Sequence, residues 1–322
     1  MFTQRARTHV GLHAGRPRGA HERGRTMDMQ GLTGSVVALV TPFLEDGSID
    51  YGSLERLVDF HLENGTDGIL VLGTTGESST MTDEEDLEVA KTVIDHVAGR
   101  IPVIGGAGSN STAESLRKAK ALEKLGADGL LLITPYYNKS NEEGIYRHFT
   151  TVLDQVDVPC LLYNIPGRTG CSISERNVAR LATHPNAWGI KEASGNISYA
   201  TMVARYLSDD FRMMSGNDDM VVPILSLGGV GVVSVWADVA PRTVHDMCEK
   251  WLSGDTKGAL KVQLDNLDLV HALFGEVNPI PVKAALAKMG LIGPTVRLPL
   301  WQLSPEADAR LEAAMKGAGI LG

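Results

Sequence analysis

The sequence predicts an α/β fold, a (β/α)8 or TIM barrel with a C-terminal helical extension. Three observations support this prediction. Short apolar runs alternate with amphipathic helical stretches, which is typical of a parallel sheet with crossover helices. A glycine, turn and strand pattern recurs at a spacing of two such units. Polar side chains follow several of the predicted strands, at the rim where these barrels carry their reactive groups.

Eight segments are predicted to be strands, because each is short, apolar and bounded by turn residues. They are 36–40, 68–72, 102–105, 129–133, 160–163, 189–191, 212–214 and 231–235. Eight strand and helix units close into a barrel, although the strand count alone leaves an open doubly wound sheet as an alternative. The chain after Pro241 has no strand signal and predicts further helices.

Local motifs predict where the helices begin and end. A helix C′ glycine, a turn and a buried strand follow one another from Gly65, again from Gly126, 61 residues later, and more loosely from Gly228. That spacing equals two βα units of about 30 residues each. Four Ser/Thr-x-x-Glu capping boxes predict helix starts. They pair Thr82 with Glu85, Ser111 with Glu114, Ser140 with Glu143 and Ser172 with Glu175.

Composition excludes several classes of protein. The 322 residues carry 30 basic and 39 acidic side chains, a formal net charge of −9, so no overall positive field would hold nucleic acid or an anionic membrane. Three cysteines without a CxxC pair indicate reduced thiols, a cytoplasmic protein and no metal site. No apolar run approaches the roughly 20 residues that cross a bilayer. Small molecules and copies of the chain itself are the expected partners.

A basic leader precedes the predicted domain. Residues 1–26 carry six arginines, three histidines and one acidic side chain, so residues 1–28 are predicted to be disordered. An arginine-rich transit peptide is one interpretation. The other is a wrongly assigned start, with translation beginning at Met27 or Met29, and it is favoured because serine is scarce and no amphipathic helix is evident. Residues 29–240 are then the barrel, and 241–322 add helices to the same domain.

Two loops at the predicted active rim carry polar groups suited to anions. After the second strand, Thr74 and Thr75 stand between glycines, where free backbone N–H groups could hold a carboxylate; a turn with a helix cap is the structural alternative. After the fifth strand, Arg168 stands between Gly167 and Gly170, where its planar fork could grip a carboxylate at two points. A salt bridge within the loop is the alternative for Arg168.

The most informative residue is Lys191, which ends the sixth predicted strand. Burial at an inward strand end disfavours the ammonium, which lowers the pKa and leaves an amine able to attack a carbonyl carbon. The structural alternatives are a lysine that reaches solvent or one paired with the adjacent Glu192. Tyr163 ends the preceding strand, so its hydroxyl could act beside the amine as a proton shuttle. No HExxH, P-loop, strand-linked GxGxxG or nucleophile elbow competes with this interpretation.

From about residue 31 to 321 the chain resembles the dihydrodipicolinate synthase, or 4-hydroxy-tetrahydrodipicolinate synthase, family of pyruvate-dependent class I aldolases and lyases. The motifs that carry the resemblance are specific in combination. They are GTTGE at 73–77, TPYYN at 134–138, YNIPGRTG at 163–170, IKEA at 190–193 and NPIPVK at 278–283.

The resemblance implies a role for each matching residue. Lys191 would form an imine with pyruvate, without any other cofactor, and Thr75 would bind the pyruvate carboxylate. Arg168 would bind the carboxylate of the second substrate, L-aspartate-4-semialdehyde. A proton relay would consist of Tyr163, Thr74 and Tyr137, and main-chain carbonyls would approach the substrate from Gly216 and Val233. In this family the residue matching Tyr137 crosses a dimer interface, so a homo-oligomer, either a dimer or a dimer of dimers, is implied.

Six further residues match a lysine feedback site at the dimer interface of lysine-sensitive family members. Ser78, Asn110, Glu114 and Tyr136 are the same as in those members, whereas Asp83 and Asp86 replace histidines. These two carboxylates could bind a lysine ammonium, but capping the helix that begins near Thr82 is the default interpretation.

Two alternatives remain for the function. N-acetylneuraminate lyase, 2-keto-3-deoxygluconate aldolase and 4-hydroxy-2-oxoglutarate aldolase share the barrel, the threonine pair, the tyrosine and the lysine. The Gly-Arg-Thr-Gly run at 167–170 favours the dipicolinate branch over them. A barrel without catalytic activity, acting as a scaffold or regulator, is the more remote alternative.

Overall fold

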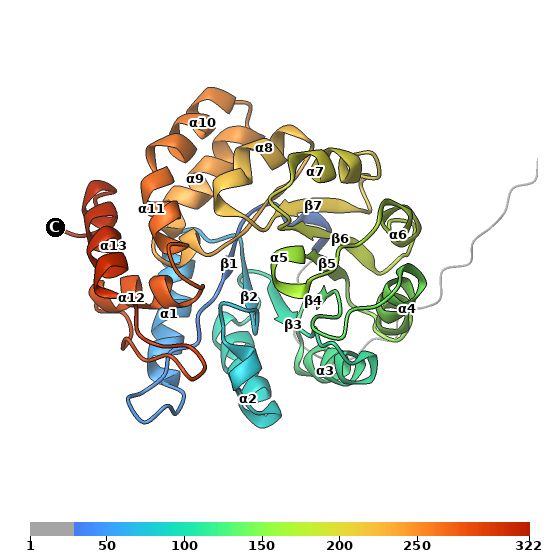
Figure 1. Ribbon diagram of the computed structural model, residues 1–322, viewed down its shortest axis with the longest axis horizontal. Coiled ribbons are helices and arrows are strands. Elements are labelled where there is room, and N and C mark those ends of the chain that lie inside the picture. Colours follow the sequence, from blue (N-terminus) through green and yellow to red (C-terminus); the bar gives the residue numbers. More distant parts are fainter. Residues whose placement is uncertain (1–28) are drawn as a thin grey trace, which may run out of the picture.

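Eight parallel strands form a closed barrel in chain order in the computed structural model, which describes residues 29–322 (Figure 1). The last strand pairs with the first, so the open sheet is excluded and the predicted (β/α)8 barrel is confirmed. The strands are β1 (Gly34–Ala38), β2 (Gly68–Val71), β3 (Val103–Gly106), β4 (Gly129–Ile133), β5 (Cys160–Asn164), β6 (Ala187–Glu192), β7 (Arg212–Ser215) and β8 (Gly231–Ser234).

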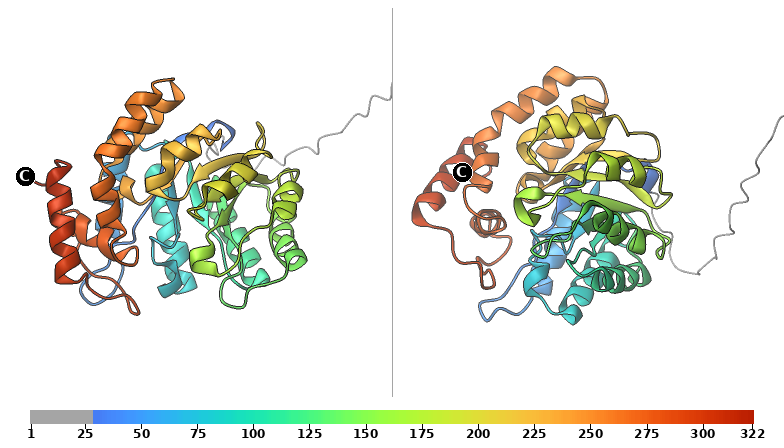
Figure 2. Two further views of the ribbon diagram at one scale, coloured as in Figure 1. Left: turned by 45° about the horizontal axis from the view of Figure 1, so that its top comes forward. Right: turned by 45° about the vertical axis from the view of Figure 1, so that its right-hand side comes forward.

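Helices surround the barrel, and a further group of helices covers one side of it (Figure 2). The helices between strands are α1 (Tyr51–Glu63), α2 (Asp83–Val97), α3 (Thr112–Leu125), α4 (Glu142–Leu153), α5 (Pro166–Thr169), α6 (Glu175–Leu181), α7 (Ile197–Ala204) and α8 (Val221–Ser226). After β8 follow α9 (Pro241–Leu252), α10 (Thr256–Asp265), α11 (Leu267–Leu273), α12 (Ile280–Lys288) and α13 (Pro305–Gly317). Short 3-10 helices are η1 (Met29–Gly31), η2 (Ser78–Thr80), η3 (Asp218–Met220) and η4 (Trp236–Asp238).

The predicted helix ends are partly confirmed. The capping box at the start of α2 is complete, and Ser111 caps α3 by accepting from the Glu114 backbone N–H. The boxes predicted at Ser140 and Ser172 are wrong. The actual N-caps are Asn141 for α4 and Ser174 for α6, because each accepts a backbone N–H in the first turn of its own helix.

The three repeated glycines have the backbone conformation that a helix C′ position requires. Gly65, Gly126 and Gly228 have φ angles of 77°, 100° and 90°, a region that other residues rarely adopt. Each therefore lets the chain leave a helix and turn directly into a strand.

The hydrophobic core has two parts, and the strands of the barrel contribute side chains to both. One lies between the strands and the surrounding helices, and the other fills the barrel. The barrel interior contains Val36, Ala38, Leu70, Ile104, Leu131, Leu161, Met214 and Val233. Strand β6 is longer than predicted, because Ala187 and Trp188 are buried with the rest of the strand. No helix within residues 29–322 is long and apolar enough to cross a membrane. The predicted leader, residues 1–28, lies outside the described residues.

Candidate active site

One cavity of about 330 Å³ opens at the carboxyl ends of the strands. This is the end where (β/α)8 barrels carry their reactive groups, because each βα loop contributes side chains to the same rim. Seven of the residues predicted to act in catalysis or substrate binding line the cavity, and Tyr137 does not. The seven are Thr74, Thr75, Tyr163, Arg168, Lys191, Gly216 and Val233.

Lys191 is buried, with 6% of its surface exposed. The register of β5 and β6 places it directly beside Tyr163, and its Nζ lies 4.3 Å from the centroid of the tyrosine ring. Burial lowers the pKa of Lys191 to about 7, while the charge of Asp218 raises that pKa and the charge of Arg168 lowers it. The amine is therefore partly unprotonated near neutral pH, and the alternative of a lysine that reaches solvent is contradicted.

The second structural alternative, a pair between Lys191 and Glu192, is also contradicted. Glu192 accepts a hydrogen bond from Asn164 Nδ2 at 2.8 Å and another from the Ser194 backbone N–H at 2.8 Å. Consecutive strand residues point to opposite faces, so the carboxylate lies outside the barrel while the amine lies inside. The contact between Asn164 and Glu192 instead holds β5 against β6 behind the pair of Tyr163 and Lys191.

Tyr163 is buried beside the amine, and this burial raises the pKa of its phenol. The hydroxyl consequently keeps its proton at neutral pH. A phenol that stays protonated can donate its proton and take up another during the reaction. This is the behaviour expected of a proton shuttle rather than of a deprotonated general base.

The loop after β2 is shaped for an anion. Leu72 and Glu77 flank it with φ angles of 61° and 54°, a strained conformation for residues other than glycine and one that clusters at functional sites. Within the described residues, the backbone N–H groups of Thr74 and Thr75 have no backbone acceptor. Both groups are therefore available to a carboxylate.

Asn278 connects this loop with the loop after β5, a role that the sequence motif did not reveal. Its Nδ2 donates to Thr75 Oγ1 at 3.0 Å, and its backbone carbonyl accepts from the Arg168 guanidinium at 3.2 Å. The loop salt bridge considered for Arg168 is absent from the described residues, since no carboxylate pairs with this guanidinium. The chain segment before α12 thus positions both of the candidate anion-binding groups.

A family model described as the dihydrodipicolinate synthetase family matches residues 31–318. The chain belongs to the dihydrodipicolinate synthetase family. A curated relative from Clostridium tetani, named 4-hydroxy-tetrahydrodipicolinate synthase, is 51% identical over 268 residues, covering 83% of this chain and 91% of the relative.

Solved structures of the dihydrodipicolinate synthetase family support the same assignment. The chloride-inhibited dihydrodipicolinate synthase of Acinetobacter baumannii in complex with pyruvate is 43% identical, with a TM-score of 0.88 over 90% of this chain and 100% of that one. An enzyme of the same name from Cyanidioschyzon merolae, solved with lysine bound, is 43% identical, with a TM-score of 0.87 over 90% of this chain and 99% of that one.

Tyr137 stands apart from the other residues that the family resemblance singles out. It is 91% exposed, has a φ of 68° and does not line the cavity of its own chain. The loop around it is held by Asn138, which donates to the Asn110 carbonyl, and by Asn110, which donates to the Tyr136 carbonyl. A tyrosine that is held by its loop but exposed to solvent could reach the active site of a neighbouring subunit. That role of Tyr137 stays a prediction.

The two aspartates predicted near the family's lysine site already have cationic partners from α3. Asp83 accepts from Arg117 at 2.5 Å, and Asp86 accepts from Lys118 at 2.9 Å and from Ser78 at 3.1 Å. Thr82 is the N-cap residue of α2, and both aspartates lie in the first turn of this helix, where a negative charge is favourable. Glu114 likewise pairs with Arg117. The carboxylates in this region are therefore occupied by cations of the same chain, and the lysine site itself stays a prediction.

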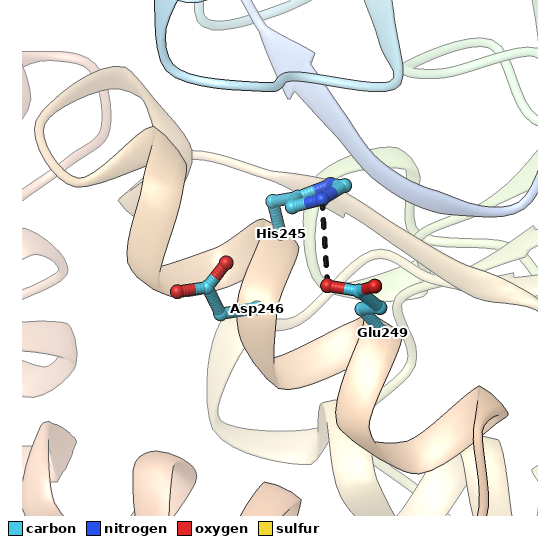
Figure 3. A group of neighbouring side chains, drawn as sticks. All are labelled: His245, Asp246 and Glu249. Atoms are coloured by element: carbon cyan, nitrogen blue, oxygen red, sulfur yellow. Dashed lines mark ion pairs between the residues drawn. The ribbon is translucent and has the colours of Figure 1, made fainter.

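Among the described residues, one group of side chains lies close enough together to hold a metal ion. His245, Asp246 and Glu249 all belong to α9 (Figure 3), and none of the three lines the cavity. The Nδ1 atom of His245 is hydrogen bonded to Asp67, and its Nε2 atom lies 3.9 Å from Glu249. Exposed acidic groups of this kind are common without a metal, and no role is assigned to this group.

Proposed function

We propose that this chain is a pyruvate-dependent lyase that condenses pyruvate with L-aspartate-4-semialdehyde, the reaction after which its relatives are named. The observation that carries the proposal is the buried amine of Lys191, beside the phenol of Tyr163 in the cavity at the carboxyl ends of the strands. The product of this aldol addition and cyclisation leads to diaminopimelate and lysine.

The first half of the reaction uses Lys191 as the nucleophile. Its neutral amine attacks the keto carbon of pyruvate, the keto oxygen leaves as water, and the resulting imine acts as an electron sink, so no other cofactor is required. The N–H groups of the loop at Thr74 and Thr75 hold the pyruvate carboxylate. Tyr163, with Thr74 and with Tyr137 of a neighbouring subunit, passes protons to and from the keto oxygen and the enamine carbon.

The second half of the reaction depends on Arg168. Its guanidinium lines the same cavity and is held by the Asn278 carbonyl, so it can grip the carboxylate of the incoming semialdehyde. A guanidinium fork matches a carboxylate better than it matches the hydroxyl groups of a sugar acid, which favours the semialdehyde as the second substrate. The main-chain carbonyls near Gly216 and Val233 complete the substrate surface.

The assembly is proposed to be a dimer or a dimer of dimers in the cytoplasm. The exposed position of Tyr137 supports this, because the proton relay is incomplete within one subunit. Sedimentation at assay concentration, together with a Tyr137→Phe variant, tests whether the assembled form is the active one. A fully active monomer would contradict the proposed role of Tyr137.

Reductive trapping tests the proposal directly. Borohydride added with pyruvate should increase the mass of the peptide that contains Lys191 by the reduced adduct. Lys283 is the informative comparison, because it is also buried and its burial lowers its pKa to about 8. Adduct on Lys283, or no adduct at all, would reject the nucleophile and with it the proposed reaction.

The pH profile of catalysis provides a second test. Only the unprotonated amine attacks pyruvate, and the pKa of Lys191 is lowered to about 7. The value of kcat/KM for pyruvate should therefore rise about tenfold per pH unit below pH 7 and level off above it. A profile that keeps rising to pH 10 would indicate a lysine with its ordinary pKa.

Arg168→Ala should separate the two substrates. We expect kcat/KM for L-aspartate-4-semialdehyde to fall about 10²-fold or more, because a charge-assisted bidentate contact is lost, while the extent of pyruvate trapping stays close to that of the unaltered protein. Arg176→Ala, which removes an exposed arginine from α6, is the matched control. Undiminished turnover of the semialdehyde by Arg168→Ala would contradict the role assigned to this residue.

The names of the curated relatives argue against the remote alternative of a barrel without catalytic activity. That alternative predicts no turnover in a coupled assay that offers pyruvate with the semialdehyde or with sugar acids. The same assay separates the proposed reaction from those of the sugar acid lyases, since only one pair of substrates should react efficiently.

A further inference from the structure

A buried carboxylate, Asp218, lies in the wall of the cavity that contains Lys191. It begins η3, two residues after Gly216, and 2% of its surface is exposed. Gly216 packs directly on the lysine, because a Cβ atom built on it would lie 3.1 Å from Lys191 Cε. The turn after β7 therefore brings a negative group and the lysine side chain to the same buried region.

Hydrogen bonds to Asp218 oppose the effect of its burial. Its Oδ2 accepts hydrogen bonds from the backbone N–H groups of Val235 at 3.0 Å and Trp236 at 2.9 Å. Hydrogen bonds donated to a carboxylate stabilise the anion. Its Oδ1 is buried and has no partner within residues 29–322. One oxygen of the carboxylate is thus fixed by two backbone donors, and the Ser234 side chain further lowers the pKa of the carboxyl group.

A second buried carboxylate, Asp238, lies close enough to Asp218 for their charges to interact. Asp238 is fully buried and accepts one backbone N–H, from Val40 at 3.2 Å. Burial, together with the charge of Asp218, raises the pKa of Asp238 well above its ordinary value. Burial raises the pKa of Asp218 as well, but Ser234, the two backbone donors and Lys191 oppose that rise. Asp218 accepts two backbone N–H groups and Asp238 accepts one, so the negative charge of this pair is better stabilised on Asp218.

We propose that Asp218 is the buried counter-charge of the cation that forms at Lys191 Nζ during catalysis. This inference rests on the proposed Schiff-base function. Condensation of the amine with the keto group consumes one proton, releases one water molecule and leaves an iminium with a positive charge in a poorly solvated site. A fixed carboxylate in the cavity wall stabilises that charge more than water-screened groups can. Asp218 acts through Lys191 and is therefore a positioning residue.

The other charged and titratable groups around Lys191 do not provide the negative charge that is assigned to Asp218. Arg168 carries a positive charge that opposes a cation at Nζ, and the Tyr163 phenol is neutral. Asp219 and His271 also line the cavity, but both side chains are exposed to solvent, which screens any charge that they carry. Among the described residues that line the cavity, Asp218 is the acidic side chain that is buried.

Asp218→Asn tests the proposal, with Asp219→Asn as the matched control in the same turn. Asparagine keeps an oxygen that can accept from Val235 and Trp236 but removes the charge. We expect the acidic limb of kcat/KM for pyruvate to move down by about one pH unit, because the ammonium loses its stabilising charge. We also expect about tenfold more pyruvate to be needed for half-maximal borohydride trapping. Asp219→Asn should shift either quantity much less, and Asp218→Glu should restore much of the original behaviour.

The pH profile distinguishes this role from a merely structural one. A structural defect would reduce trapping without moving the acidic limb to lower pH, and such a result would overturn the proposal. If Asp218→Asn does not fold, infrared difference spectra of the wild-type protein labelled with ¹³C-aspartate replace it. Pyruvate addition at pH 7 should then perturb an ionised carboxylate band, and a change confined to protonated carboxyl bands would overturn the proposal. Absence of any pyruvate adduct in the wild-type protein would instead reject the Schiff-base function.

Discussion

Lys191→Met is expected to abolish turnover, with kcat falling about 10⁴-fold or more, because no other lysine among the described residues lines the cavity. Methionine has nearly the same length as lysine and no charge, so it fits the buried position between Tyr163 and Gly216. The unfolding free energy should not fall, since the change removes an amine that burial leaves poorly solvated. Chemical denaturation and a coupled assay measure the two quantities.

The control for this variant is Lys139→Met, which removes an exposed lysine from the loop after β4. It should keep its turnover and its borohydride adduct. Loss of activity in both variants would point to the net charge of the rim rather than to one nucleophile. Residual activity of Lys191→Met above about 1% would mean that a different amine supplies the imine.

The position of Lys191 could be predicted from the sequence because the relevant signals are local. A short apolar run that ends in lysine, beside a strand that ends in tyrosine, predicts a buried pair once a parallel barrel is assumed. The glycine repeat fixed the phase of the strand and helix units in the same way. By contrast, the capping boxes at Ser140 and Ser172 were wrong because Asn141 and Ser174 compete as caps within two residues, and local sequence does not rank them.

The parts of the site that could not be predicted depend on contacts over long sequence separations. Asn278 reaches Thr75 across 203 residues, and Lys283 reaches Glu77 across 206. These contacts form because the segment before α12 and α12 itself pack against the loop after β2, which no periodicity in a single sequence reveals. Asp218 was overlooked for a related reason, since its charge matters only once β7 and β8 are closed around Lys191.

Breaking the buried ion pair of Lys283 and Glu77 should produce the largest loss of stability that the site offers. The two side chains are almost completely buried, and Nζ lies 2.6 Å from Oε1 and 4.2 Å from the centroid of the Phe43 ring. Lys283→Met would leave the carboxylate of Glu77 buried with the Arg297 backbone N–H as its remaining donor. We expect the unfolding free energy to fall by about 3–5 kcal/mol, measured by urea denaturation.

Replacing the other partner of the ion pair, Glu77, should lower the unfolding free energy by a smaller amount. Glu77→Gln keeps an oxygen for the Arg297 N–H, and the Lys283 amine, whose pKa is lowered to about 8, can release its proton once its partner is gone. The double variant Glu77→Gln with Lys283→Met should then recover most of the stability lost by Lys283→Met, because no unpaired charge remains buried. If the loss of unfolding free energy in the double variant equals the sum of the losses in the two single variants, Glu77 and Lys283 do not interact.

In these two single variants and the double variant, pyruvate binding should respond differently from the unfolding free energy. Glu77 holds the end of the loop that carries Thr74 and Thr75, and its own backbone is strained at a φ of 54°. Without its anchor on α12 the loop can relax, so the double variant should fold and still need several times more pyruvate for half-maximal trapping. If the double variant binds pyruvate as tightly as the unaltered protein, the ion pair stabilises the fold alone, and the shape of the anion loop is fixed by Asn278 and the turn itself.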